Sequence, residues 1–276
     1  MTGTGMSHGA VTVINAIPCG IGATMGVALE TRAEFSTEGG SRTVEILNDP
    51  DEDTRMAEVC VRRAYERAGA DEPDGWRLRT DSGIPASRGL KSSSSACNAI
   101  LGAVFSEIGY GIGETDLITL GTECAMEAGV TVTGSFDDAC GCALGGLVMT
   151  DNTSCRIVSR SGIGTYDVVI HVPPDKIRKT DLPLDALRSE ADDMRRAIGI
   201  AMRDPFSAMT LNGRLIAEAS GLDNSLAEEA VGMGALGAGI TGTGPATAVV
   251  VPAGKGPGFA SELGLDPQET IITVTR

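Results

Sequence analysis

The strongest constraint on this chain is a run of four serines, residues 92–95, directly before its most regular helical pattern. Between Cys97 and Ile108 the apolar residues recur every three or four positions, which predicts an α-helix. The first N–H groups of a helix lack partners inside the helix and carry partial positive charge, so they can bind a phosphate. The alternative is a helix that the serines only cap, although four serines exceed what one cap needs.

Two common nucleotide-binding motifs are excluded. The sequence lacks GxxxxGK[ST], so it has no P-loop of the usual kind. Residues 237–242 match GxGxxG, but that motif needs a strand before it and a helix after it. Here Pro245 and a β-like segment at residues 247–251 follow, so the dinucleotide interpretation fails.

The net charge limits the partners of the chain. Its 276 residues include 22 basic and 37 acidic side chains, which gives a formal net charge of −15. Such a field repels nucleic-acid phosphates and anionic membranes, so we expect small-molecule substrates and neither of those partners. Only four of the basic residues are lysines, which fits either a halophilic, salt-adapted protein or a GC-rich genome. We expect salt adaptation.

Cysteine usage and the N-terminus suggest a location. The seven cysteines include no CxxC pair, and only two histidines accompany them, which argues against a disulfide framework or a zinc site. The first nine residues lack a basic region followed by an apolar run, and no window reaches the ~18 apolar residues of a membrane helix. We therefore expect a cytoplasmic protein.

Hydrophobic periodicity predicts alternating strands and helices, which is typical of an α+β protein. Strands are expected at residues 11–17, 27–35, 43–47, 76–82, 145–150, 157–160, 167–172, 237–241, 247–251 and 271–274. Helices are expected at residues 53–68, 92–108, 114–128, 184–202 and 207–219. The pattern restarts after a turn near residue 152, so we expect an N-terminal domain at 1–158 and a C-terminal domain at 159–276.

Two adjacent carboxylates, Asp137 and Asp138, stand where a further helix is expected to begin. Ser135 with Asp138 three residues later resembles a capping box, which explains Asp138 and leaves Asp137 free. Upstream, Glu123 and Glu127 are four residues apart on one face of the helix expected at 114–128. These two glutamates either form a solvated acidic face or place one carboxylate on a divalent cation near the phosphate.

Three segments, in this order, resemble the motifs of the GHMP small-molecule kinases: residues 89–94 (GLKSSS), 134–138 (GSFDD) and 239–245 (GITGTGP). The middle motif alone would indicate only that superfamily. Further details are similar to the archaeal shikimate kinases, and the similarity spans nearly the whole chain. These details are residues 15–18 (NAIP) before a glycine-rich turn, Lys91 followed by serines, residues 136–139 (FDDA) and residues 211–213 (LNG).

The resemblance implies a two-domain GHMP kinase fold of the α+β class. Its N-terminal domain would contain a left-handed β-α-β unit, its C-terminal domain would be ferredoxin-like, and ATP and substrate would lie between them. The implied reaction is magnesium-dependent transfer of the γ-phosphate of ATP to the 3-hydroxyl of shikimate, on the route to aromatic amino acids. Two alternatives stay open: a kinase of the same superfamily acting on homoserine or a mevalonate-like alcohol, and a non-catalytic binding protein of the same fold.

The resemblance also implies residue roles. Asp137 matches the catalytic aspartate, and Ser93 matches the serine that binds Mg²⁺. Glu127 is the best match for the acidic metal ligand, with Glu123 as the alternative. The residues expected to bind the nucleotide are Pro85, Ala86, Ser87, Arg88, Gly89, Leu90, Lys91, Ser92, Ser93, Ser94 and Ser95, together with Gly242, Thr243 and Gly244.

One position departs from the family pattern. Many archaeal shikimate kinases have a lysine in the first glycine-rich turn, and this chain has Ile21 there. Either Lys91 or Arg88 supplies the missing positive charge, or the turn only shapes the substrate pocket. Because shikimate carries a carboxylate, we also expect an arginine to pair with it, although the sequence does not indicate which one.

Overall fold

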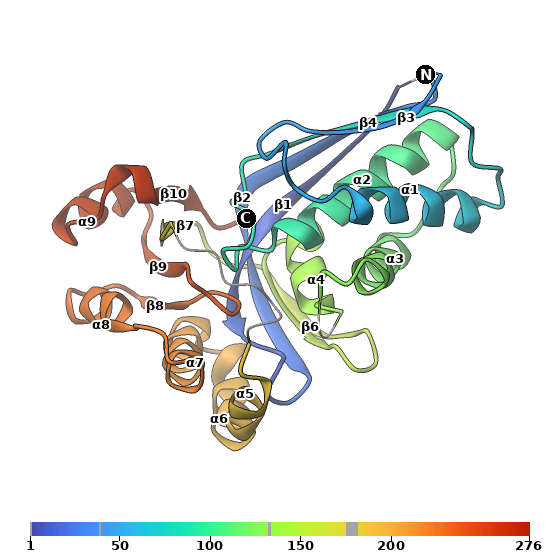
Figure 1. The fold of residues 1–276 in the computed structure, drawn as a ribbon. Helices are drawn as coiled ribbons and strands as arrows, with labels where there is room; N and C mark the ends of the chain where they lie inside the picture. The colour runs from blue at the N-terminus through green and yellow to red at the C-terminus, as the bar shows by residue number, and fades with distance from the viewer. Residues whose placement is uncertain (1, 39, 132–133, 175–181) are drawn as a thin grey trace.

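The computed structural model describes residues 2–38, 40–131, 134–174 and 182–276, and two β-sheets organise them (Figure 1). The N-terminal half contains the larger sheet, with helices α1–α4 on one side of it (Figure 1). The C-terminal half contains a four-stranded sheet surrounded by α5–α9 (Figure 1). The expected α+β class is confirmed.

Two long strands carry the larger sheet, because β1 and β2 pair antiparallel along nearly their whole length. The other edge of β2 is shared: its second part pairs with β4, and its first part pairs with β5. β3 joins β4 in parallel, and β6 joins β5 antiparallel. The strands are β1 (Thr2–Ile14), β2 (Ile21–Ser36), β3 (Arg42–Ile46), β4 (Trp76–Ser82), β5 (Leu147–Asp151) and β6 (Arg156–Ser161).

Helix α2 is the centre of the helical layer. It lies directly on β1, because Gly3 and Gly5 have no side chains and a Cβ on either would collide with the backbone of α2. On its outer side α2 packs against α1 and α3, so Cys60, Ile100 and Cys124 share one core. Packing on both sides fixes the direction in which the N-terminus of α2 points. The helices of this layer are α1 (Arg55–Ala68), α2 (Ser92–Ile108), α3 (Glu114–Glu127) and α4 (Phe136–Leu144).

The smaller sheet has the strand order β10-β7-β9-β8, with all neighbours antiparallel. Along the chain its elements follow a β-α-β-β-α-β sequence, which is the ferredoxin-like pattern. Successive residues of β7 face opposite sides: Val168 and Ile170 belong to the core shared with α6 and α7, and Val169 packs with α8 and α9. The strands are β7 (Tyr166–His171), β8 (Gly237–Ile240), β9 (Thr247–Pro252) and β10 (Thr270–Val274).

Some expected elements need correction. The single helix expected at 184–202 is two helices, because Glu190, with φ −77° and ψ 5°, leaves helical geometry between them. Two short helices, α8 and α9, were not predicted at all. The expected boundary after residue 158 lies inside β6, which pairs with β5 in the larger sheet; the division into two domains stays a prediction. The helices of this half are α5 (Leu184–Ser189), α6 (Ala191–Ala201), α7 (Pro205–Ser220), α8 (Ser225–Gly232) and α9 (Gly256–Glu262).

Among the described residues, no helix combines the length and the apolar character that crossing a membrane demands.

Candidate active site

A cleft of about 430 Å³ is lined by residues from both halves of the molecule. The end of β1, the loop before α2, the start of α4 and the turn between β8 and β9 all contribute to its walls. Motifs that are far apart in the sequence therefore meet in one place. The predicted residues that line it are Ser87, Gly89, Lys91, Ser92, Ser93, Ser94, Asp137, Gly242, Thr243 and Gly244.

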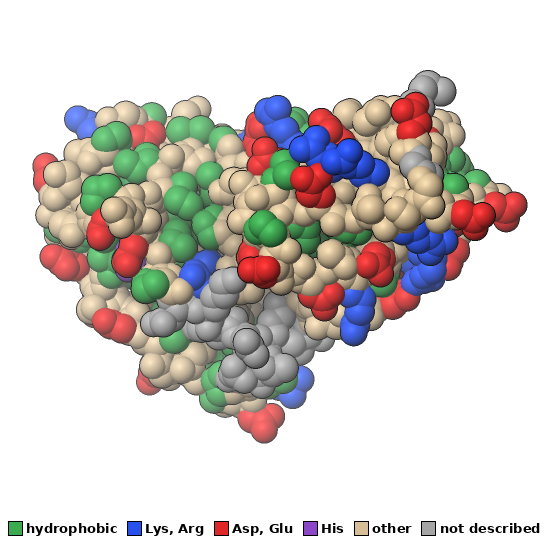
Figure 2. Space-filling view, turned by 45° about the horizontal axis from the view of Figure 1, so that its top comes forward, with side chains coloured by type: hydrophobic (Ala, Val, Ile, Leu, Met, Phe, Trp, Pro, Cys, Tyr) green, Lys and Arg blue, Asp and Glu red, His purple; other side chains and the backbone are tan. Residues whose placement is uncertain are grey.

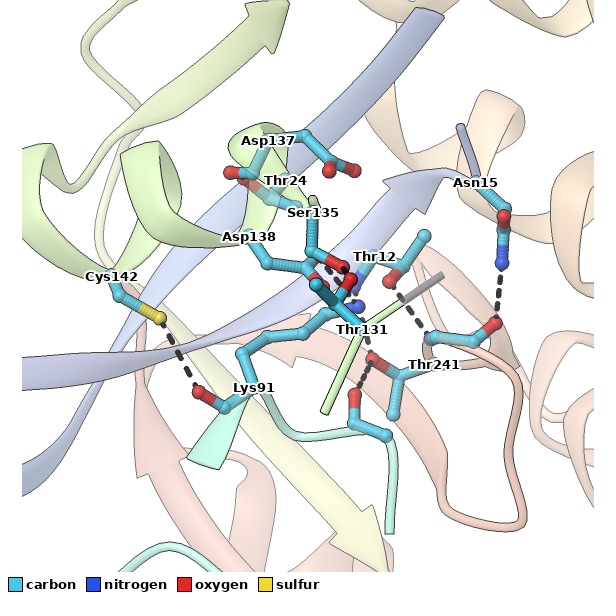
Figure 3. A network of polar contacts seen from close by, with 12 residues as sticks. Thr12, Asn15, Thr24, Lys91, Thr131, Ser135, Asp137, Asp138, Cys142 and Thr241 are labelled. Carbon is cyan, nitrogen blue, oxygen red and sulfur yellow. Dashed lines mark hydrogen bonds and ion pairs between the residues drawn. The ribbon is translucent and has the colours of Figure 1, made fainter. Parts of the chain in front are cut away.

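The N-terminus of α2 opens onto this cleft. Lys91 precedes the helix in a left-handed conformation with φ 69°, and its side chain does not cap the helix. The Lys91 side chain is only 6% exposed, and its Nζ lies 2.9 Å from Oδ1 of Asp138 (Figure 3). Ser92, Ser93 and Ser94 stand on the first turn, whose N–H groups have no partners inside the helix. The start of α2 thus presents amide donors, hydroxyls and one ammonium group to the cleft.

Asp137 supplies a carboxylate that is almost completely buried, with 4% exposure. Nδ2 of Asn152 donates a hydrogen bond to Oδ1 of Asp137 at 2.7 Å. The backbone carbonyl of Asp137 accepts one from Oγ1 of Thr24 (Figure 3). Burial raises the pKa of Asp137 from the usual 3.8 to about 7, and the neighbouring Asp138 charge adds to this rise. The Lys91 ammonium and the Asn152 amide oppose it. A carboxyl group with a pKa near 7 is poised to exchange a proton at neutral pH.

The predicted capping box is wrong. Ser135 adopts a left-handed conformation with φ 51°, and its side chain makes no capping hydrogen bond. Its hydroxyl instead shares a hydrogen bond with Oγ1 of Thr131 at 2.8 Å. The Asp138 carboxylate pairs with the Lys91 ammonium.

The C-terminal half closes the cleft through a reciprocal set of hydrogen bonds (Figure 3). Thr12 donates its backbone N–H to Oγ1 of Thr241 at 3.0 Å and accepts the N–H of Gly242 on its own Oγ1 at 2.8 Å. Nδ2 of Asn15 donates to the carbonyl of Gly242 at 2.8 Å. The Thr241 hydroxyl donates to the carbonyl of Gly89 in the loop before α2. These bonds hold the glycine turn of one half against the loop of the other.

Five predicted nucleotide-binding residues do not line the cleft. Leu90 is 1% exposed and belongs to the hydrophobic core, and Ser95 is fully buried one turn into α2. The Arg88 guanidinium donates to the carbonyl of Pro174. Pro85 and Ala86 lie in the turn that leads to the loop. The glycine and serine content of this segment indicated the loop correctly but could not indicate which side chains face inward.

The structure does not bring the predicted metal ligand Glu127 to the cleft. Glu127 pairs on the surface of the helical layer with Arg62 and Arg63 of α1. The alternative, Glu123, pairs with Arg63 at 2.5 Å. Both glutamates lie on one face of α3, as the spacing predicted, and that face turns towards the arginines of α1. Of the two interpretations of this pair, the solvated face is the one that the structure supports.

Comparison with known proteins shows the family of this chain. Residues 55–146 match the family described as the GHMP kinases N terminal domain. The shikimate kinase of Methanosarcina acetivorans is 39% identical over 254 residues, which cover 91% of this chain and 85% of that protein. The chain belongs to the shikimate kinases of the GHMP kinase family.

Solved structures agree on the GHMP kinase fold. The mevalonate kinase of Methanococcus jannaschii matches with a TM-score of 0.81 at 15% sequence identity, covering 100% of this chain and 98% of that chain. The structure of MDDEF in complex with MVAPP, AMPPCP and magnesium matches with a TM-score of 0.75 at 14% identity, covering 100% of this chain and 97% of that chain. The resemblance read from the sequence and the fold class that it implied are both confirmed.

Sequence reasoning missed two polar residues of this shikimate kinase site. Thr12 lies on a strand that was expected to be simply buried, and its hydroxyl contacts a turn 230 positions away. Asn152 was interpreted only as part of a turn, whereas its side chain holds Asp137. A short polar residue directly after a buried strand was the available signal for Asn152, and it did not indicate a partner.

Proposed function

We propose that this protein transfers the γ-phosphate of ATP to the 3-hydroxyl of shikimate, producing shikimate 3-phosphate and ADP in the cytoplasm. The observation that carries the proposal is the buried Asp137 carboxylate in the same cleft as the N-terminus of α2. Membership in the shikimate kinases selects the acceptor, and the cleft supplies the groups that phosphoryl transfer requires. That reaction depends mainly on positioning and on neutralisation of phosphate charge.

The phosphates would lie between the start of α2 and the turn formed by Gly242, Thr243 and Gly244. The amides and hydroxyls of Ser92, Ser93 and Ser94 can donate to phosphate oxygens, as helix N-termini commonly do. Among the described residues that line the cleft, Lys91 is the single cation, and we assign to it the charge that is missing at Ile21. Arg88 is the weaker candidate, because its guanidinium is engaged by Pro174.

Magnesium fits this site as a companion of the phosphates. Within the described residues, no group of three or more His, Cys, Asp or Glu side chains could hold a metal by itself. Mg²⁺ typically binds substrate phosphates with only one or two protein ligands, and the Ser93 hydroxyl would be one of them. When bound, the ion would neutralise charge on the transferred phosphate. Glu127 is not part of this proposal.

Asp137 would act on the acceptor. Its carboxylate can take the proton of the 3-hydroxyl or orient that hydroxyl towards the γ-phosphate. Because burial raises the pKa of Asp137 to about 7, the carboxylate is both substantially populated and basic enough to be effective near neutral pH. The shikimate carboxylate needs a cationic partner, and no arginine is found among the described residues that line the cleft.

A panel of acceptors in an ADP-release assay tests the proposal. We expect turnover with shikimate, and none with homoserine or mevalonate, at equal enzyme concentration. The panel is run in low and in molar potassium chloride, because the net charge of −15 predicts that activity and melting temperature rise as salt screens the repulsion. Turnover of homoserine or mevalonate alone would identify a different kinase, and no turnover of any acceptor would favour a binding protein.

A further inference from the structure

The side chain of Asn152 grips both the backbone and the carboxylate of Asp137. Asn152 directly follows β5, and Asp137 lies on the first turn of α4. Oδ1 of Asn152 accepts hydrogen bonds from the backbone N–H of Asp137 at 3.1 Å and from the hydroxyl of Thr150 at 2.7 Å. Nδ2 of Asn152 donates a hydrogen bond to Oδ1 of Asp137 at 2.7 Å. The backbone N–H of Asn152 donates in turn to the carbonyl of Gly20 at 2.8 Å, so the residue is fixed at both ends.

These contacts determine which way the amide of Asn152 is turned. A backbone N–H can only donate, so the amide end that faces the N–H of Asp137 must be the oxygen. The NH₂ end therefore faces the carboxylate, where it favours the ionised form over a protonated Oδ1. Asn152 is 7% exposed, so water does not compete freely for this contact.

The strand beneath Asp137 leaves room for its second oxygen. Gly22 of β2 lies under the carboxylate, and a Cβ on residue 22 would collide with Oδ2 of Asp137. Thr24, two residues further along the same strand, holds the backbone carbonyl of Asp137 at 2.9 Å. The carboxylate is thus oriented by β2 on one side and by Asn152 on the other.

We propose that Asn152 is a positioning residue that occupies Oδ1 of Asp137 and so leaves Oδ2 as the oxygen that receives the proton of the acceptor hydroxyl. This inference rests on the proposed function, because it assumes that Asp137 acts on an acceptor hydroxyl. Asn152 itself does not contact the substrate; it acts through Asp137. Gly22 complements it by leaving the space that Oδ2 occupies.

The test compares two buried asparagines that hold the same helix. Asn98 is 4% exposed, and its Nδ2 donates to the carbonyl of Ala139 in α4 at 3.0 Å, without a bond to Asp137. Asn152→Ala and Asn98→Ala each remove one buried amide that anchors α4. The rate kcat is measured from pH 5 to 9 with saturating ATP and with whichever acceptor the wild-type protein phosphorylates. Other titratable groups that act on Asp137 are Asp138, Cys140 and Cys142 on α4 and Lys91 before α2, and both variants retain all four.

The expected result is a shift confined to Asn152→Ala. Losing the donor raises the pKa of Asp137, so the acid limb of kcat moves to higher pH by about 1 unit, and kcat falls about fivefold at pH 7. The KM for ATP stays within about twofold, because the phosphate-binding groups are untouched. Asn98→Ala keeps the wild-type acid limb even if its melting temperature falls by a similar amount.

An unchanged acid limb in Asn152→Ala, with a loss of kcat no larger than in Asn98→Ala, would show that Asn152 is only structural. If Asn152→Ala does not fold, Asn152→Asp gives the same readout, because it keeps the oxygen that accepts from Asp137 and Thr150. The negative charge that Asn152→Asp adds beside Asp137 also moves the acid limb of kcat to higher pH. Wild-type protein that phosphorylates no acceptor would refute the proposed function itself, and that outcome is separate from any effect of Asn152.

Discussion

Two clusters of carboxylates and cations in the N-terminal half have similar chemistry and opposite surroundings. In the cleft, Lys91 pairs with Asp138 beside Asp137, and their side chains are largely buried. On the helical layer, Glu127 pairs with Arg62 and Arg63, and the exposed fractions of the glutamate and of Arg62 are 41% and 40%. Figure 2 shows acidic and basic side chains interspersed over the outer surface of this half.

The difference shows that burial, and not residue type, determines whether a charged cluster can take part in chemistry or only forms solvated surface ion pairs. Exposed ion pairs contribute only about 0–1 kcal/mol each, because water and salt screen them and two long side chains must be ordered. In the cleft, desolvation raises the pKa of Asp137 to about 7. The sequence contains glutamates and aspartates in both places, and only the packing distinguishes the two groups.

The largest expected effect comes from Asp137→Asn. The change keeps the shape of the side chain and its contact with Asn152 but removes the base, so kcat falls by at least ~10²-fold. Binding of ATP, measured by calorimetry, stays close to that of wild type. If Asp137→Asn retained near-normal kcat with shikimate, Asp137 would have no catalytic role.

The same variant tests the burial argument through stability. The pKa of Asp137 is raised from 3.8 to about 7 in the folded state, so the unfolded chain releases this proton at lower pH than the folded protein does. Stability is therefore lost as pH rises through that window, and Asp137→Asn should melt at higher temperature than wild type at pH 8. Identical melting curves at pH 8 would mean that the carboxylate is better solvated than its surroundings indicate.

The next largest effect is expected from breaking the pair between Lys91 and Asp138. Lys91→Met removes the cation from the cleft, so kcat/KM for ATP should fall about 10²-fold, the scale of losing one charged donor. Asp138→Asn retains the cation and should act mainly on melting temperature, since it leaves a buried ammonium without its partner. If Asp138→Asn abolished turnover without unfolding the protein while Asp137→Asn did not, the catalytic aspartate would be the neighbour.

A smaller effect is expected from Ser93→Ala. The hydroxyl is one donor among several at the start of α2, and loss of a helix-capping group costs only ~1 kcal/mol of stability. We expect a higher KM for Mg-ATP and a melting temperature within a few degrees of wild type. Unchanged KM and kcat would mean that the serine has no role in binding the metal.

The smallest effect is expected from Glu127→Gln, which breaks the exposed cluster. Its carboxylate touches arginines and not the cleft, so kcat and KM should stay within about twofold of wild type. A large loss of kcat, measured in the same assay as Asp137→Asn, would show that Glu127 acts in the active site.

Most of the fold could be predicted from the sequence, because the longest elements carry strong periodicity. The helices over residues 55–68, 92–108 and 114–127 and the hairpin of β8 and β9 lie where apolar spacing placed them. The N-terminal strand begins at Thr2, earlier than predicted. The prediction missed its first part because the glycines there have low strand propensity. They lie in the sheet because α2 packs directly on them, a tertiary contact that local propensity does not express.

The candidate site was predictable only in part. Motif order indicated Asp137, Lys91 and the glycine turn, since each stands at the start of a helix or between strands. The surroundings of the α3 glutamates depend on how α1 packs against α3, so residue spacing alone left the role of Glu127 ambiguous. The role of Asn152 depends on β5 ending beside the start of α4, a contact across 15 positions that no local pattern encodes.

The pH dependence of kcat is the most direct test of the buried Asp137 base. With saturating shikimate and ATP, a base whose pKa is about 7 gives a kcat that falls tenfold per pH unit on the acid side, with the midpoint of the limb near pH 7. The limb should be absent from the residual activity of Asp137→Asn. A kcat that stays constant from pH 8 down to pH 5 in the wild-type protein would show that no group of this kind acts in the reaction, and it would contradict the role assigned to Asp137.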